Sequence, residues 1–81
     1  MRIDKFMNAV NIVKRRSVAQ DMLRSQVVYL NDQLAKPSKE VKVGDIITIK
    51  YLKGEKRYKV LQIPSVKNIP KAKMDEYVKE L

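Results

Sequence analysis

The chain opens with MRIDKFMNAVNIVKRRS, residues 1–17, and this stretch predicts a helix with an apolar face and a charged face. The apolar residues follow the i, i+3, i+4, i+7 spacing of one helical face. They are Ile3, Phe6, Met7 and Val10. Arg2 and Lys5 lie three residues apart, on a stripe away from the apolar one. Asp4 lies near the expected helix N-terminus, where the dipole favours a carboxylate and where the carboxylate could orient a nearby arginine.

A second cationic cluster, Lys14, Arg15 and Arg16, directly precedes a second expected helix. Residues 17–20, SVAQ, fit the S-x-x-Q capping box, in which Ser17 and Gln20 pair with exposed backbone N–H groups. The expected buried face of this helix consists of Val18, Ala19, Met22 and Leu23. Cations at the positive end of a helix dipole favour an anion site. A solvated basic loop is the simpler alternative for this cluster alone, but the two clusters together suit a run of phosphates.

The middle of the chain predicts a small antiparallel sheet, because short runs rich in β-branched and aromatic residues alternate with turn residues. Asn31 and Asp32 form an expected hairpin turn, since both residue types tolerate positive φ. A second hairpin turn is expected at residues 53–56. The expected strands are residues 27–30, 33–36, 41–43, 46–51 and 57–63.

The end of the chain predicts a connector and a last helix. Two prolines bound residues 64–70, and proline stops regular structure. Residues 71–81 then show another helical spacing, which comprises Met74, Tyr77, Val78 and Leu81. The order of helices and strands indicates an α+β fold, with an RNA-binding unit at 1–63 and a connector with a C-terminal helix at 64–81. This helix is expected to pack on the sheet, with binding of a protein partner as the alternative.

Composition narrows the function classes. The 81 residues include 18 basic and 9 acidic side chains, a net charge of +9 that is typical of a polyanion-binding domain. Residues 64–81 carry four lysines and three acids, so +8 of the charge lies in residues 1–63. The chain has no cysteine and no histidine, which removes thiolate zinc sites, disulfides and the commonest general base. Because no paired carboxylates stand at a plausible site either, we expect no enzyme, no cofactor and no metal.

No segment of the sequence predicts membrane insertion or export. An apolar run of about 20 residues would be needed to span a membrane, and none is present. The N-terminus is charged but lacks the following apolar stretch of a signal peptide. We therefore expect a cytoplasmic protein without a membrane partner.

Five blocks at consistent spacing resemble the S4 RNA-binding domain. The blocks are RIDKF at 2–6, KRRSxA at 14–19, VxLN at 28–31, KPS at 36–38 and VGDxI at 43–47. The resemblance covers about residues 1–51 and implies an S4-like fold of the αL-motif type. Two positions depart from the family pattern. The family usually has glycine where Gln26 stands and Asn-Gly where this chain has Asn31 and Asp32.

The resemblance is strongest to the small free-standing S4 proteins that associate with ribosomes. It implies binding to a large (50S) subunit obstructed by peptidyl-tRNA, with contacts to 23S rRNA near helix 69 and to tRNA. It also implies that the protein acts beside a tailing factor of the RqcH/NEMF type and supports C-terminal alanine tailing of stalled chains. A heat-shock-type role in recycling 50S subunits and a generic module for structured RNA remain alternatives. Off the ribosome the protein is expected to be a monomer.

The expected mode of binding is recognition of RNA shape and phosphates, since an RNA helix hides its major-groove base edges. The expected RNA-binding residues are Arg2, Lys5, Lys14, Arg15, Arg16 and Lys36, with Asp4, Ser17 and Asn31 in supporting roles. Tyr29, Tyr51 and Tyr58 are expected to pack in the sheet rather than to stack bases. A protein-interaction module and an accessory to an RNA-modifying enzyme remain alternatives. DNA binding is disfavoured because no long recognition helix is expected.

Overall fold

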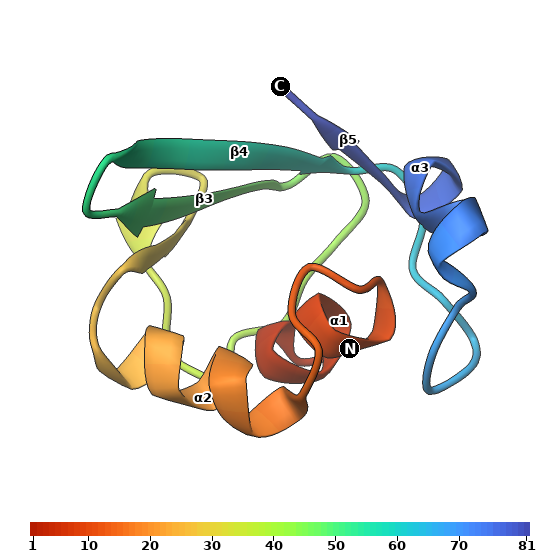
Figure 1. Cartoon of the computed structure of the whole chain (residues 1–81), viewed down its shortest axis with the longest axis horizontal. Helices are drawn as coiled ribbons and strands as arrows, with labels where there is room; N and C mark the ends of the chain where they lie inside the picture. Colours follow the sequence, from red (N-terminus) through yellow and green to blue (C-terminus); the bar gives the residue numbers. More distant parts are fainter.

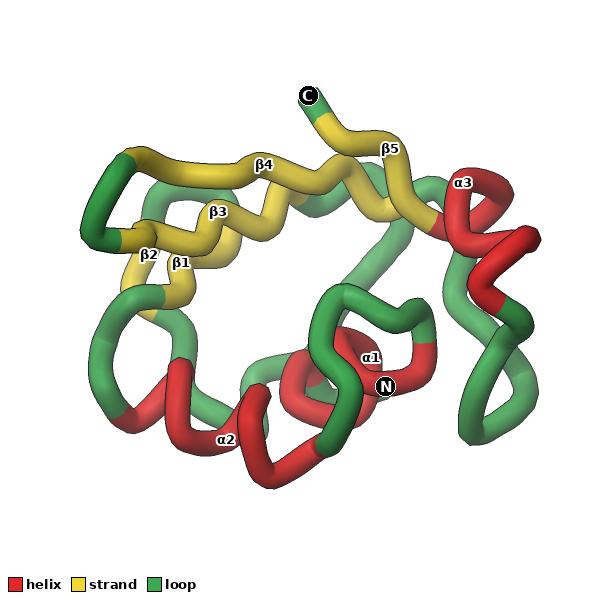
Figure 2. The backbone as a smooth tube through the Cα atoms, in the orientation of Figure 1, coloured by secondary structure: helices red, strands yellow, loops and turns green.

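Two short helices lie against one face of a five-stranded antiparallel sheet (Figure 1). The computed structural model describes residues 1–81. Helices α1 (Ile3–Ala9) and α2 (Arg16–Arg24) come first, followed by strands β1 (Val28–Leu30), β2 (Gln33–Leu34), β3 (Ile46–Tyr51) and β4 (Gly54–Val60). A 3-10 turn η1 (Lys71–Lys73), a single-turn helix α3 (Met74–Tyr77) and strand β5 (Val78–Glu80) end the chain. The sheet order is β2-β1-β3-β4-β5. Figure 2 shows the strands on one side of the molecule and the α1 and α2 helices on the other.

The core lies between α1 and the sheet, and the predicted apolar face of α1 fills it. Ile3, Phe6, Met7 and Val10 are each 0% exposed, which confirms the helical spacing. The strand register places the sheet's share of the core on the same side. These residues are Val28, Leu30, Ile47, Ile49, Tyr58 and Val60. The α+β prediction is confirmed, and the helix layer is held in one position by this shared core.

The N-cap of helix α2 lies two residues before the predicted Ser17, so the predicted capping box is wrong. Arg15 is the extended N-cap residue, with φ −136° and ψ 144°, and no side chain caps the helix. Ser17 therefore lies inside the first turn, where its hydroxyl is past the capping position. The buried face is also narrower than predicted. Ala19 and Leu23 are buried, whereas Val18 is 42% exposed because α2 packs through a single stripe.

The turn after α2 keeps its geometry although Gln26 replaces the usual glycine of the family. Gln26 adopts φ 62°, in the left-handed region. Its N–H bonds to the Leu23 carbonyl and the Val27 N–H bonds to the Met22 carbonyl, which together form a Schellman motif. A residue with a Cβ is strained by about 1–2 kcal/mol in this conformation.

Gln26→Gly should therefore raise the free energy of unfolding by about 0.5–1 kcal/mol, since glycine relieves the strain but loses more chain entropy on folding. Thermal unfolding followed by circular dichroism measures the change, and a rise of several degrees in Tm is expected. Gln26→Ala is the matched control, because alanine keeps the strained Cβ. A Tm that falls in the glycine variant would contradict the prediction.

The β1–β2 hairpin also uses left-handed backbone at both turn residues. Asn31 has φ 51° and Asp32 has φ 66°, as expected for a type I′ turn. The Asn31 side chain is part of the scaffold: its Oδ1 accepts the Ile46 N–H at 2.9 Å, and its Nδ2 donates to Asp45 Oδ1 at 3.0 Å. These bonds fix the turn to the start of β3.

The predicted helix over 71–81 is wrong beyond Tyr77. Residues 78–80 form β5, which pairs antiparallel with β4 and places Val78 opposite Val60. The Leu61 N–H bonds to the Tyr77 carbonyl at 2.8 Å, and the Leu81 N–H bonds to the Arg57 carbonyl at 2.9 Å. The free edge of β4 therefore overrides the local helical spacing, because pairing satisfies backbone groups of β4 and buries Val78.

Other boundaries also differ from the sequence prediction, and β2 ends at Leu34 rather than at residue 36. Residues 41–43 are not a strand, since only a single bridge joins Arg2 to Glu40 and the chain then turns at Gly44, with φ 93°. The β3–β4 turn is shorter than predicted, because Tyr51 pairs with Gly54. Strand β4 ends at Val60 rather than at residue 63.

The segment before η1 is tied to α1 by backbone and side-chain bonds. The Ile69 N–H bonds to the Ala9 carbonyl at 2.9 Å, and Asn11 Nδ2 donates to the Ile69 carbonyl at 2.8 Å. Ile69 is buried and joins the main core. The longest helix has nine residues, and none has the length and apolar character needed to cross a membrane.

Candidate nucleic-acid interface

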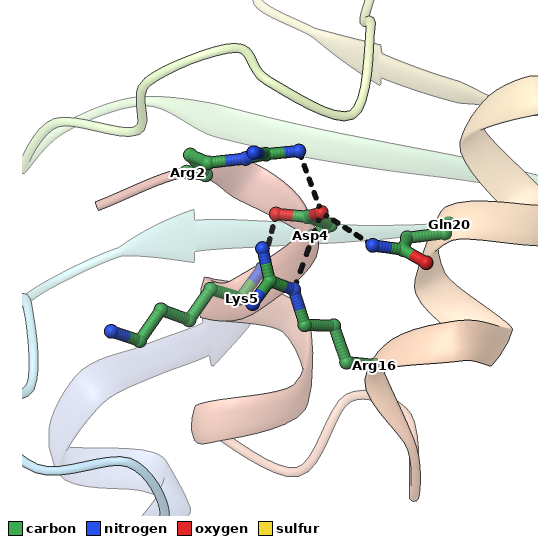
Figure 3. Close-up of polar contacts among 5 residues, drawn as sticks. All are labelled: Arg2, Asp4, Lys5, Arg16 and Gln20. Carbon is green, nitrogen blue, oxygen red and sulfur yellow. Dashed lines mark hydrogen bonds and ion pairs between the residues drawn. The ribbon is translucent and has the colours of Figure 1, made fainter.

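A fully buried carboxylate organises the cationic residues at the start of the chain. Asp4 is 0% exposed and lies in the first turn of α1. Its Oδ2 accepts from Arg2 Nη2 at 3.1 Å, from Arg16 Nε at 3.4 Å and from Gln20 Nε2 at 3.1 Å. Its Oδ1 accepts the Lys5 N–H at 2.7 Å. Figure 3 shows these groups converging on Asp4 from α1 and α2, and we call the five residues the Asp4 cluster.

The cluster keeps Asp4 ionised. Burial by itself would raise the pKa of this carboxyl, but the Gln20 and Lys5 hydrogen bonds and the charges of Arg16 and Arg2 outweigh it. The net effect lowers the pKa of Asp4 below its ordinary value of 3.8. Near neutral pH a negative charge therefore lies beneath both arginines and fixes their positions.

This pKa shift predicts an acid-dependent loss of stability. Above the ordinary value of 3.8 the ionised Asp4 contributes its full stabilisation, which is lost as the pH falls below that value and through the lower folded-state pKa. Urea unfolding from about pH 6 to about pH 3 should show wild-type stability converging on that of Asp4→Asn, which has no carboxyl to titrate there. A constant gap between the two proteins across this range would contradict the prediction.

The two arginines are anchored at one end and open at the other. Their side chains are 49% exposed for Arg2 and 44% exposed for Arg16. Arg16 bonds Asp4 through Nε, which leaves the donors of both terminal nitrogens without a partner in the chain. The Lys5 side chain extends away from Asp4 (Figure 3). Pre-oriented guanidinium groups with outward donors match the bidentate geometry of phosphate recognition.

The N-terminus of α2 adds to the same surface. No side chain caps this end, and the exposed Lys14 and Arg15 directly precede Arg16. Asn8 Nδ2 donates to the Lys14 carbonyl at 3.0 Å and so fixes the loop that carries these cations to α1. An uncapped helix start surrounded by three cations favours an anion. Ser17 is exposed here but makes no capping bond, so its predicted capping role is wrong.

Lys36 stands on a separate segment that reaches the helix layer through the backbone. Its carbonyl accepts the Lys39 N–H at 3.0 Å, and the Lys39 carbonyl accepts the Ile3 N–H at 2.7 Å. The segment thus runs beside the start of α1, although Lys36 makes no bond to the Asp4 cluster. Both lysines are exposed. No group of three or more histidine, cysteine, aspartate or glutamate side chains is arranged to hold a metal ion.

The family model of the S4 domain matches residues 1–47, more than half of the chain and all of the helix layer. The chain belongs to the S4 domain family. It is 53% identical over 78 residues to the RQC P-site tRNA stabilizing factor of Helicobacter pylori strain J99, covering 96% of this chain and 93% of that relative. It is 36% identical over 63 residues to the Heat shock protein 15 homolog of Haemophilus influenzae, covering 78% of this chain and 48% of that relative.

A solved structure shows the same fold along the whole S4 chain. The trimeric structure of Vibrio cholerae Heat Shock Protein 15 superposes with a TM-score of 0.89 at 31% identity. It covers 100% of this chain and 81% of that one. The strand β5 and the residues before it therefore lie within the part of the fold that the two proteins share.

The S4 domain brings together part of the predicted site and adds one residue to it. The Arg2 and Arg16 side chains meet at Asp4, whose predicted role as partner of a nearby arginine is confirmed, whereas Lys5 contacts Asp4 only through its backbone N–H. Sequence reasoning missed Gln20 in this cluster, because the capping-box spacing assigned its side chain to the backbone. The usable signal was its i, i+4 spacing from Arg16, which places both side chains on one face of α2. The RNA-binding role of these residues stays a prediction.

The tyrosines of the S4 domain differ from one another in exposure. Tyr58 packs in the core as predicted, and burial, followed by the charge of Glu80, raises its pKa above the ordinary value. Tyr51 is 47% exposed at the end of β3, so the prediction that it packs in the sheet is wrong. Tyr29 lies under Lys50, with the ammonium 4.6 Å from the ring centre.

Proposed function

We propose that this S4 domain binds RNA on the large ribosomal subunit and stabilises tRNA there during ribosome-associated quality control. The single observation that carries the proposal is the buried Asp4, which holds two half-exposed arginines whose remaining donors have no partner in the chain. The relative with 53% identity is named for stabilising P-site tRNA, and it spans nearly the same length. A non-enzymatic role fits a surface built of cations around a structural carboxylate.

The binding mode we propose is recognition of folded RNA through its backbone. Arg2, Arg15 and Arg16 grip phosphates through paired N–H donors, and Lys5, Lys14 and Lys36 supply point charges. The helix layer that carries this surface is rigid, because α1 is fully packed in the core and α2 is pinned to it through Asp4. A rigid cationic surface selects RNA shape rather than base sequence. This surface lies within residues 1–63, and residues 64–81 complete the sheet behind it.

The finer assignments are those that the S4 resemblance of the sequence implies. We propose that the RNA contacted is 23S rRNA near helix 69 together with the tRNA of an obstructed 50S subunit. The protein would work in the cytoplasm beside a tailing factor of the RqcH/NEMF type and support C-terminal alanine tailing. Subunit recycling of the heat-shock type is the second candidate, favoured by the TM-score of 0.89 to the Vibrio cholerae protein.

Purification after cross-linking in cells tests the proposal. The protein is recovered under denaturing conditions, and the attached RNA is sequenced. We expect large-subunit rRNA and tRNA, with the tRNA still esterified to a nascent chain. Alanine tails on that nascent chain distinguish the quality-control role from recycling, which requires no tail. Absence of ribosomal RNA from the cross-linked material would reject the proposed function.

A further inference from the structure

The face of the sheet that points away from the helices carries a second set of cations. Both α1 and α2 lie on the other side of the sheet (Figure 1). Strand alternation and the pairing register place one row of residues, Tyr29, Thr48 and Arg57, on this outer face. Lys50 follows Thr48 by two positions and Lys59 follows Arg57 by two positions, so both share the face. We call it the outer sheet face.

Two lysines on this face oppose each other in register. Lys59 of β4 is paired with Lys79 of β5, and both are exposed. Like charges directly opposite on neighbouring strands are destabilising. Neither lysine has an acidic side chain as an ion-pair partner, and Arg57 has only the half-exposed Glu55, at 3.2 Å. A costly arrangement of cations is relieved when an anion lies across it.

A shallow hollow on the outer sheet face supplies groups that suit a nucleotide. Its volume is about 160 Å³, and Tyr29, Thr48, Lys50 and Arg57 contribute to its lining together with Asp32 and Glu55. Thr48 is 3% exposed, yet its buried Oγ1 has no hydrogen-bond partner. The Tyr29 ring beside the Lys50 and Arg57 cations suits the base and phosphate of a nucleotide, whereas the enclosed Thr48 Oγ1 takes no part.

We propose that the outer sheet face is a second RNA-binding surface, which holds the backbone of a separate RNA segment along Lys50, Arg57, Lys59 and Lys79. The inference rests on the proposed function in taking RNA as the ligand and adds a second contact to it. Residues two apart on a strand are about 6.6 Å apart, on the scale of successive phosphates along an extended RNA strand. Cations on opposite faces let one small domain hold two RNA segments together.

An acidic protein is the other polyanion that this face could attract. The arrangement of the cations, rather than their net charge, favours RNA. Asp32 and Glu55 lie among the cations and would repel a carboxylate-rich peptide as well as a phosphate, so net charge does not discriminate. Arg57 lines the hollow with Tyr29, and Lys59 and Lys79 continue the cations from Arg57 toward β5, which suits a repeating phosphate chain with a base on the aromatic ring. The partner class is an outcome of the test below.

Paired charge removal tests the surface. Association of the full chain with large ribosomal subunits carrying peptidyl-tRNA is measured over a range of salt concentrations. Lys59→Ala combined with Lys79→Ala should weaken association about tenfold and reduce the slope of log affinity against log salt by about 2, since each phosphate contact contributes about 1. Its Tm should be unchanged or higher, because the like-charge pair is removed. Lys71→Ala combined with Lys73→Ala is the control of equal charge, on the exposed η1 turn.

The identity of the ligand follows from photo-cross-linking. A benzophenone amino acid is placed at position 59 or, on the helix side, at position 5. We expect each position to capture RNA, and the two captured segments to differ. The inference is overturned if position 59 captures only protein, or if it captures the same RNA segment as position 5. It is also overturned if the double variant keeps the affinity and the salt slope of the wild type. If Arg16→Ala then still weakens association, the proposed function stands without the second surface. A wild-type chain that fails to bind large subunits would overturn both.

Discussion

Arg16→Ala should weaken association with large ribosomal subunits carrying peptidyl-tRNA by about 10- to 100-fold while the fold stays intact. The variant loses a pre-oriented guanidinium, and a charge-assisted contact to phosphate contributes about 1.5–3 kcal/mol. The cost to folding is smaller, because the Arg16 side chain is 44% exposed and its ion pair with Asp4 is partly screened. Sedimentation with purified subunits measures the association, and a melting curve measures the fold.

The control for Arg16→Ala lies on the same helix. Arg24→Ala removes an equal charge from the last turn of α2, about two turns beyond Arg16 and with no bond to Asp4, and should change association less. Arg16→Lys should give an intermediate loss, since lysine keeps the charge but lacks the paired donors and the Nε bond to Asp4. Co-sedimentation that is the same for Arg16→Ala and wild type would reject the assignment of Arg16 to the RNA surface.

Asp4→Ala should lower the free energy of unfolding by about 2–3 kcal/mol. Asp4 accepts four hydrogen bonds, and its loss leaves the Lys5 N–H and the Gln20 amide without that acceptor. An unpaired buried polar group costs about 1–3 kcal/mol, whereas the half-exposed arginines regain water and add little. Asp4→Asn keeps the side-chain volume and one acceptor oxygen, so about half this loss is expected. Urea unfolding with linear extrapolation measures both variants.

The Asp4→Asn variant also tests whether Asp4 positions the arginines or whether the surface binds RNA through its net charge alone. Asp4→Asn raises the net charge from +9 to +10, so a surface that works by charge alone would bind RNA more tightly. If Asp4 positions the arginines, Asp4→Asn should instead bind large subunits several-fold more weakly. The affinity is measured near neutral pH, where the wild-type Asp4 is ionised. Tighter binding by Asp4→Asn would show that Asp4 has no positioning role.

Prediction from the sequence succeeded where the signal is local. The spacing of Ile3, Phe6, Met7 and Val10 placed α1 and its buried face, because a helix repeats every 3.6 residues whatever it packs against. The turn at Asn31 and Asp32 was likewise readable, since the left-handed backbone it requires is a property of those residue types. The end of the chain failed for the opposite reason. Residues 74–81 have a helical apolar spacing, and only the unpaired edge of β4 makes residues 78–80 a strand.

The sequence by itself determined the α+β class, the apolar face of α1, the excess of positive charge and the S4 resemblance. Only the tertiary structure decided that Gln20 and two arginines meet on a buried Asp4, and that Lys59 opposes Lys79 on the outer sheet face. Composition and periodicity can be read from the residues in their order along the chain, whereas these contacts join residues from different helices and strands. Their geometry depends on how the helices pack on the shared core and on the register in which the strands pair.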